Sequence, residues 1–449
     1  MAKRSAATMG HRTYALAAVL GTCFVGWGCS ASDDPAAAGT PGSSSASSSS
    51  SSGSGSSGSG SSSSGAGGAG SSTTATSTST TTGGSTTTGG TGGGGTGSSA
   101  DFVHKLGKTN FLIGLGPHES DYPPTGQVDI RYIYLVGNKN PAYAWPKWNQ
   151  PDGEYAMITA NDALQHGAIP MFTIYEFAVL GDGNFNVIRD ATYMPQFWSD
   201  LQLLATRLKA FDAPALVHLE PDFWGYAQQN SPNGVKGFMA QVKIAPGCGD
   251  LPDDLTGFGA CVLRIFRTTA PKTLVGFHGS QWAAYGGDGK PDGGAVGRFV
   301  NEITGGQQDF IATDILDRDA GCFELQVNDP MYNCVRGGKT GWYWDETNAT
   351  SPNFHEFLAW SKALRDGAGV PLLWWQVPMG EPSATPGGTA AHYRDNRVHY
   401  IFSHVREFID AGGAGVCFGA GAAGQTGIGS DNGQFERALN GYNKAPEPF

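Results

Sequence analysis

The feature that most constrains this chain is a regular alternation of short apolar runs with longer segments of helical period, from Asn110 to the C-terminus. Runs of strand length that alternate with helical segments are typical of a parallel sheet with crossover helices. The alternation gives eight strand-like runs, at residues 111–116, 130–137, 169–177, 215–222, 274–280, 310–316, 371–377 and 414–420.

Seven segments of helical period accompany these runs, at residues 154–166, 193–211, 255–269, 295–303, 353–366, 392–411 and 434–442. Eight strands and seven helices predict an α/β fold, a (β/α)8 barrel with long βα loops. The alternative is an open doubly wound sheet, which usually carries a Gly-rich phosphate turn after its first strand. Here that strand ends in Gly114-Leu115-Gly116 and Pro117 follows, so the pattern favours the barrel.

The N-terminus has the layout of a secretory signal. Lys3, Arg4 and Arg12 precede an apolar run at residues 14–25, which is too short to cross a membrane as a stable helix. Gly28-Cys29-Ser30 resembles the lipobox of bacterial lipoproteins, although Gly26 stands where that motif usually has Leu. The resemblance implies removal of residues 1–28, acylation of Cys29 and attachment to the outer or cytoplasmic membrane. We therefore expect a protein that is secreted, periplasmic or on the cell surface.

Residues 29–100 contain a long tract of Ser, Gly and Thr. Such a tract has too little apolar surface to offset the entropy of ordering, so we expect a disordered linker. The predicted organisation is a signal peptide at residues 1–28, the linker, and a barrel domain at residues 101–449.

The cysteines indicate two disulfides. In an oxidising compartment we expect the sequence-local pairs Cys248 with Cys261 and Cys322 with Cys334, each closing a short loop. Cys417 lies in an apolar run and is expected to be a buried free thiol. No CxxC spacing occurs, and we expect neither a metal nor another cofactor.

The formal net charge is -11, and Lys and Arg do not cluster. This balance argues against a nucleic-acid partner and favours an uncharged substrate. Nothing in the chain signals an oligomer, so we expect a monomer.

Polar side chains interrupt the fourth strand-like run. His218, Glu220 and Asp222 occupy every second position and would share one face of a continuous strand, with the acids at its carboxyl end. Burying carboxylates costs several kcal/mol unless they are paired, so the run indicates an ion pair or a functional site. Other strand ends carry further polar groups, and these are His118, Glu176, His278, Gln281, Asp314 and Gln376.

Several carboxylates at a barrel mouth with aromatic walls suit glycoside hydrolysis, which needs one acid to protonate the leaving oxygen and a second carboxylate to activate water or attack the sugar. Flat indole rings offer faces on which sugar rings stack. We therefore predict a polysaccharide as the substrate. The predicted substrate contacts are His118, Trp224, His278, Gln281, Trp282, Trp375 and Gln376.

Leu219-Glu220-Pro221-Asp222 resembles the strand-end motif of the glycoside hydrolase family 6 cellulases. The resemblance implies that Asp222 is the general acid of an inverting reaction and that Glu220 is a neighbouring charge that favours its protonated form. The third run ends in TIYEFA rather than the aspartate-rich segment of that family, whose barrel is also incomplete. The prediction is therefore a glycosidase-like barrel and not membership of that family.

The second carboxylate is predicted to be Asp314, then Glu176, then Glu381. A separation of about 6.5 to 9.5 Å from the acid would favour inversion and about 5 Å retention. A retaining version would use Glu220 as the acid and Glu381 as the nucleophile. The seventh strand ends in Gln376 where many retaining barrels have Glu, and this absence weakens the retaining version.

Two other functions fit the same residues. A metal-dependent hydrolase would use His118, Glu119, Glu220, Asp222, His278 and Asp314 as ligands, although no HxH or HExxH spacing occurs. A surface lipoprotein that binds glycan without cleaving it would explain the missing acid of the seventh strand.

Overall fold

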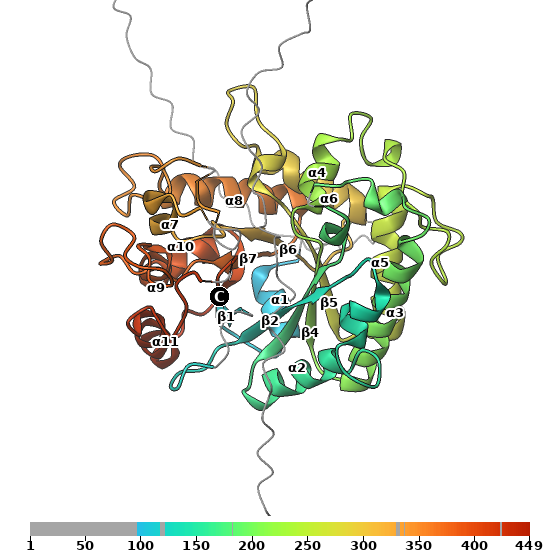
Figure 1. The fold of residues 1–449 in the computed structure, drawn as a ribbon, viewed down its shortest axis with the longest axis horizontal. Coiled ribbons are helices and arrows are strands. Elements are labelled where there is room, and N and C mark those ends of the chain that lie inside the picture. The colour runs from blue at the N-terminus through green and yellow to red at the C-terminus, as the bar shows by residue number, and fades with distance from the viewer. Residues whose placement is uncertain (1–96, 117–121, 182, 329–332, 336, 423) are drawn as a thin grey trace, which may run out of the picture. The chain divides into compact units, whose positions relative to one another are not determined.

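The computed structural model describes residues 97–449 except 117–121, 182, 329–332, 336 and 423. Eight parallel strands close into a barrel in the order of the sequence, and helices surround it (Figure 1), so the predicted (β/α)8 architecture is confirmed. Cys29, the signal and most of the linker lie outside the described residues. The strands are β1 Leu112–Leu115, β2 Ile130–Val136, β3 Ile169–Tyr175, β4 Ala215–Leu219, β5 Thr273–His278, β6 Phe310–Asp314, β7 Leu372–Val377 and β8 Gly413–Phe418.

Six of the seven predicted helices form as single elements. They are α2 Glu154–Gln165, α3 Met194–Phe211, α5 Leu255–Thr269, α6 Gly293–Thr304, α8 Phe354–Ala368 and α11 Gln434–Lys444. The seventh prediction, one helix over residues 392–411, is wrong. The chain forms α9 Arg397–Ser403 and α10 Val405–Asp410, because His404 between them has φ -135° and ψ 32°, which is not helical.

Three short helices were not predicted, α1 Ser99–Lys105, α4 Phe223–Gln229 and α7 Ala320–Leu325. Within the described residues, no helix is both long enough and apolar enough to cross a membrane.

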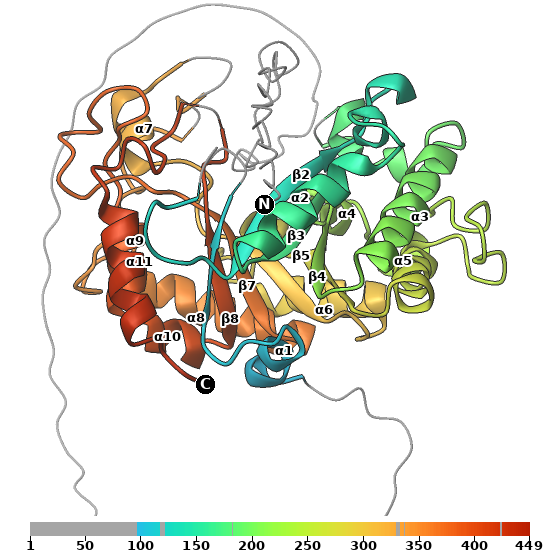
Figure 2. The same cartoon turned by 90° about the horizontal axis from the view of Figure 1, so that it is seen from below.

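Helix α1 covers the amino ends of the strands. Its Ser99 hydroxyl donates to the carbonyl of Gly412, which precedes β8, at 2.9 Å. Its Phe102 ring lies 5.5 Å from that of Phe310, the first residue of β6. Figure 2 shows α1 at the lower end of the barrel. The helix therefore closes the end of the barrel opposite the carboxyl ends of the strands.

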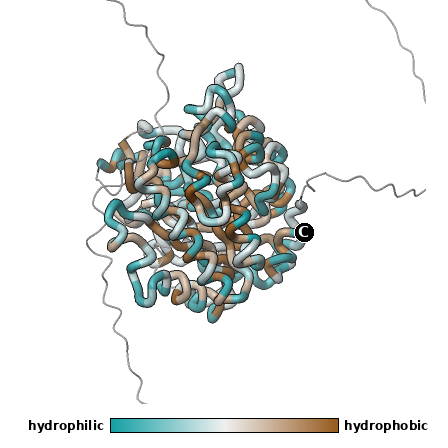
Figure 3. Tube along the Cα trace, turned by 90° about the vertical axis from the view of Figure 1, so that its right-hand side faces the viewer, coloured by the Kyte–Doolittle hydropathy of each residue, from teal (hydrophilic) through white to brown (hydrophobic). Residues whose placement is uncertain are grey.

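The apolar core has two parts. The larger lies between the strands and the surrounding helices, and the smaller fills the amino half of the barrel interior, where Ile130, Met171 and Leu216 pack with α1. Hydrophobic stretches of the chain gather inside and hydrophilic ones outside (Figure 3). Gly276 on β5 is needed in this interior, because a Cβ there would come within 2.5 Å of the Phe310 ring.

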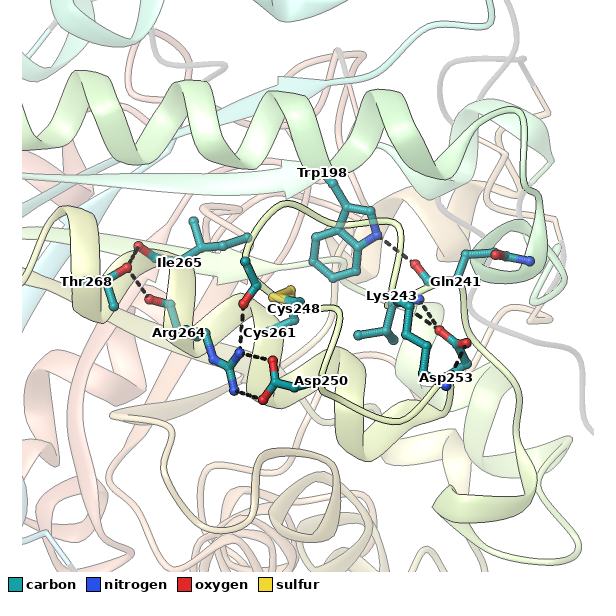
Figure 4. Close-up of a disulfide and its surroundings, with 12 residues drawn as sticks. Trp198, Gln241, Lys243, Cys248, Asp250, Asp253, Cys261, Arg264, Ile265 and Thr268 are labelled. Atoms are coloured by element: carbon teal, nitrogen blue, oxygen red, sulfur yellow. Dashed lines mark hydrogen bonds and ion pairs between the residues drawn. A yellow bond between two sulfur atoms is a disulfide. The ribbon is translucent and has the colours of Figure 1, made fainter.

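Both predicted disulfides are confirmed, as Cys248–Cys261 and Cys322–Cys334, and Cys417 is a buried free cysteine. Burial raises the pKa of the Cys417 thiol well above its usual value. The first disulfide ties the loop before α5 to that helix (Figure 4). Arg264 of α5 also makes a two-point ion pair with Asp250, at 2.6 and 3.0 Å, so this loop is fixed by covalent and polar contacts.

Candidate active site

Strand β4 ends at Leu219, earlier than predicted. Glu220 and Asp222 follow with φ of 45° and 68°, in the left-handed region that non-glycine residues rarely adopt. These angles break the alternation of side chains, and the expectation that Glu220 shares the interior face with His218 is wrong, because its carboxylate accepts from the backbone of Glu176 and Phe177. Strained backbone of this kind is concentrated at functional sites.

A polar layer lies above the apolar half of the barrel interior, on β3 to β6. His218 Nε2 lies 3.2 Å from His278 Nδ1, and His218 Nδ1 lies 3.4 Å from Thr173 Oγ1. On the other side, His278 Nε2 lies 3.6 Å from Asp314 Oδ1. Four side chains on neighbouring strands thus form one row that ends in a carboxylate. Thr173 was missed by the sequence analysis, although strand alternation places it opposite His218.

Burial changes along this row. His218 and His278 are buried, whereas the side chain of Asp314 is 32% exposed at the end of β6. Burial, and then the nearby His278, hold the pKa of His218 well below its usual value, so its ring is neutral at neutral pH. The row therefore carries a neutral imidazole in the interior and an accessible carboxylate at the carboxyl end of the barrel.

Trp375 on β7 lies against both imidazoles, with ring centroids 5.0 Å from His218 and 5.8 Å from His278. The indole is buried, and within the described residues its N–H has no hydrogen-bond acceptor. A buried donor without an acceptor is uncommon in folded proteins. Such a donor is available to a water molecule or a ligand oxygen.

Gln376 is turned out of the strand pattern by a φ of 58°, at an irregularity in the pairing of β7 with β8. Its side-chain amide donates to the hydroxyl of Tyr134 on β2 at 2.6 Å. Tyr134 also lies 5.8 Å, ring to ring, from Trp375. This tyrosine was not predicted. The available signal was its position two residues after Tyr132 on β2, a spacing that puts both rings on the same face of the strand.

Glu176 lies on the helix side of the sheet and not at the mouth. It follows Tyr175, whose ring packs against Tyr134 in the interior, so alternation turns Glu176 outward. Its Oε1 accepts from the indole N–H of Trp145 at 2.8 Å, and the residue is fully buried. Within the described residues, its Oε2 has no hydrogen-bond donor. The prediction of Glu176 as a mouth carboxylate is therefore wrong.

Glu220 turns toward the end of β3 and accepts from its backbone. Glu176 N donates to Oε1 at 3.0 Å, and Phe177 N donates to Oε2 at 3.1 Å. Burial raises the pKa of Glu220 to about 8, although these backbone donors oppose the rise. Burial also raises the pKa of Glu176 well above its usual value and that of Asp200 on α3 to about 7. We call Glu176, Asp200 and Glu220 the outer acid cluster.

Asp222 is half-buried and directly precedes α4. Trp282, also half-buried, packs on Tyr226 of that helix with ring centroids 4.7 Å apart. Gln281 is half-buried beside Trp282, and the substrate contacts predicted for both residues stay predictions. His118 lies outside the described residues.

Trp224 is a core residue. Its indole N–H donates to the carbonyl of Leu219 at 2.9 Å, and its ring packs on Phe258 and Phe277. The predicted stacking of a sugar on Trp224 is therefore wrong, because the ring is buried between the sheet and the helices.

Glu381 lies in the loop after β7, where its Oε2 lies 3.8 Å from His392 Nε2 and also accepts from Asn432. These two partners are themselves loop residues. Within the described residues, no group of three or more His, Cys, Asp or Glu side chains is placed to hold a metal ion. His118 and Glu119, two of the ligands of the metal alternative, are outside that part of the chain.

No protein-family model matches the chain, and no curated protein matches it. The solved structures that resemble it include glycoside hydrolases. An endo-β-1,4-mannanase double mutant of Cellulomonas fimi has 10% identity and a TM-score of 0.43, covering 78% of this chain and 74% of its own. A Bacteroides ovatus GH5 xyloglucanase has 12% identity and a TM-score of 0.43, covering 76% and 77%. A family 1 β-glucosidase of Thermotoga maritima has 10% identity and a TM-score of 0.41, covering 75% and 98%. At this level of similarity the activity has to be argued from the site itself.

Proposed function

We propose that this protein is a glycoside hydrolase that acts on a polysaccharide at the carboxyl end of its barrel. The observation that carries the proposal is the partly exposed carboxylate of Asp314, which ends a row of buried polar side chains on β3 to β6. Active sites of (β/α)8 barrels are built at this end. The buried indole N–H of Trp375, which pairs in register with Asp314 and lacks an acceptor within the described residues, supplies a donor on the neighbouring strand.

Asp222 is the proposed general acid. It follows β4, and Asp314 ends β6, so the two are separated by one intervening strand of the barrel. Because neighbouring strands lie about 4.8 Å apart, strands β4 and β6 are about 10 Å apart. Carboxylates that follow strands which are not neighbours can lie far enough apart to leave room for a water molecule between one carboxylate and the anomeric carbon, as inversion requires.

In the proposed step Asp314 takes a proton from water, and the water oxygen bonds to the anomeric carbon. The bond from that carbon to the glycosidic oxygen breaks, and Asp222 gives its proton to the departing oxygen. Asp314 thus ends protonated and Asp222 ionised, and exchange with solvent restores both groups.

The N-terminal sequence supports a surface location for this activity. A signal at residues 1–28 and acylation of Cys29 would place the barrel outside the cytoplasm at the end of a Ser/Gly/Thr linker. An enzyme held in this way meets large polymers outside the cell. Acylation is tested by palmitate labelling of the wild type beside Cys29→Ala, which should lose the label.

The activity is tested by release of reducing sugar from plant, fungal and bacterial polysaccharides by the full-length protein. Asp222→Asn and Asp314→Asn should each lose most of the activity while still folding. Asp366→Asn is the matched control, because Asp366 is an exposed carboxylate near the end of α8 that pairs with Lys362. The anomeric form of the first product, followed by NMR, should be inverted.

If both Asp222→Asn and Asp314→Asn released sugar at the wild-type rate, the assignment of these residues as acid and base would be overturned. Loss of activity in EDTA would favour the metal-dependent alternative. Binding of a polysaccharide without any product would favour a glycan-binding protein, a function that the amide Gln376 at the end of β7 also fits.

A further inference from the structure

We infer that His278 and His218 are positioning residues for Asp314, because a hydrogen bond joins the two imidazoles and His278 Nε2 faces that carboxylate at 3.6 Å. The catalytic consequence of this inference rests on the proposed function, but the protonation pattern can be measured without any substrate. The row runs from Thr173 through His218 and His278 to Asp314.

If each imidazole carries a single proton, the distances leave two ways to place these protons. His218 Nε2 and His278 Nδ1 are 3.2 Å apart, so one must carry the hydrogen and the other must accept it. If His278 Nδ1 carried it, the lone pair of His278 Nε2 would face the Asp314 carboxylate at 3.6 Å. Two negative ends would then face each other in a partly buried site.

The opposite arrangement removes that repulsion. His218 Nε2–H donates to His278 Nδ1, and His278 Nε2–H then points at Asp314 Oδ1. His218 Nδ1 is then an acceptor, and the Thr173 hydroxyl, 3.4 Å away, can donate to it. Both histidines are therefore Nε2–H tautomers, and their dipoles align toward the carboxylate.

Such an arrangement gives Asp314 a defined role. A donor that faces one oxygen of a carboxylate restricts the rotation of that carboxylate. The other oxygen then stays in a fixed direction, where it can accept a proton from water. His278 was predicted to contact substrate, but its two ring nitrogens face His218 and Asp314 in the buried interior.

The tautomers are tested by long-range ¹H–¹⁵N NMR of the full-length protein, with the two rings assigned from His218→Gln and His278→Gln. Both rings should give the pattern of a neutral Nε2–H imidazole at pH 7. The groups around them are Thr173, Trp375 and Asp314. A neutral Nδ1–H tautomer at either ring, or an imidazolium at either ring, would overturn the inference.

A pair of variants separates positioning from packing. The amide nitrogen of His278→Gln can occupy the place of Nε2 and still donate to Asp314, whereas that of His278→Asn reaches only the place of Nδ1. We expect kcat to fall roughly tenfold in His278→Gln and roughly a hundredfold in His278→Asn, with KM little changed. Equal loss in two equally folded variants would show that the ring only fills space.

The two proposals fail in different ways. Nε2–H tautomers in a protein that cleaves no polysaccharide would support the proposed arrangement of the two histidines and contradict the proposed glycosidase activity. Release of sugar together with an Nδ1–H tautomer at His278 would support the proposed glycosidase activity and contradict the proposed arrangement of the two histidines.

Discussion

The barrel holds two groups of buried polar side chains that differ in which side of the sheet they occupy. The interior row of Thr173, His218, His278 and Asp314 ends in a carboxylate that solvent reaches. The outer acid cluster lies between the sheet and the helices, where Glu220 accepts from backbone N–H groups and Glu176 from Trp145. Both groups contain acids at strand ends, but only the acid of the interior row is partly exposed.

The difference in position between the two groups shows that burial alone does not tell the function of an acid. Burial raises the pKa of each member of the outer acid cluster, which is a property often associated with catalysis. Here the geometry shows carboxyl groups that join the end of β3 to β4 and to the loop carrying Trp145. We therefore assign the outer acid cluster to stability and the interior row to chemistry.

The largest expected effect separates the two groups by activity. Asp314→Asn should lower kcat by about 10² to 10⁴-fold, because it removes the proposed base. Glu176→Gln should stay close to wild type, since its carbonyl oxygen can still accept from Trp145. Steady-state kinetics on the best polysaccharide checks both. The assignment is lost if Glu176→Gln is the inactive variant.

The next effect separates the groups by stability. Glu220→Ala should lower the free energy of unfolding by on the order of 3 kcal/mol, because the buried backbone N–H groups of Glu176 and Phe177 lose their acceptor. Urea denaturation measures the loss. Glu302→Ala, at an exposed position on α6, is the control and should change stability by less than about 0.5 kcal/mol. A similar loss in both variants would contradict the role given to Glu220.

The outer acid cluster should also make stability depend on pH. The pKa of Glu220 is about 8 in the folded protein, against an ordinary value of 4.5, so the folded state holds its proton longer than the unfolded state. Its contribution to stability is complete below about pH 4.5 and declines as the pH rises toward 8, by at most about 1.4 kcal/mol per pH unit.

Glu220→Gln should remove this decline. The free energy of unfolding of the variant, relative to that of wild type, should therefore rise between pH 5 and pH 8. Urea titrations of both proteins at the two pH values measure the change. A difference that stays constant with pH would show that Glu220 titrates normally.

The smallest effect is expected at the far end of the interior row. Thr173→Val keeps the shape of the side chain but removes the hydroxyl that faces His218 at 3.4 Å. We expect a loss of about 1 kcal/mol or less in stability and less than about a threefold change in kcat. Thr173→Ser, which keeps a hydroxyl, is the control. A larger fall in kcat for Thr173→Val alone would extend the positioning role to Thr173.

The barrel could be predicted because its strands are buried on both faces and read as apolar runs separated by helical segments. Parts of the site could be predicted for the same reason, since alternation places His218 and His278 in the interior. The same rule would have turned Glu176 outward, because Thr173 and Tyr175 occupy the interior face of β3.

The rest depends on backbone angles that side-chain identity does not reveal. A φ of 45° at Glu220 and of 58° at Gln376 redirects each side chain at the end of its strand. Neither residue is glycine or asparagine, the types that usually mark left-handed positions. The sequence also does not reveal long-range hydrogen bonds such as the one that Trp145 donates to Glu176.

The closed end of the barrel has a consequence for access. The described chain enters through α1, whose Ser99 and Phe102 lie at the amino ends of the strands. Whatever precedes residue 97 is therefore joined to the face opposite Asp314. If the protein is held by that segment, a large polymer can approach the open end of the barrel without having to pass the point of attachment.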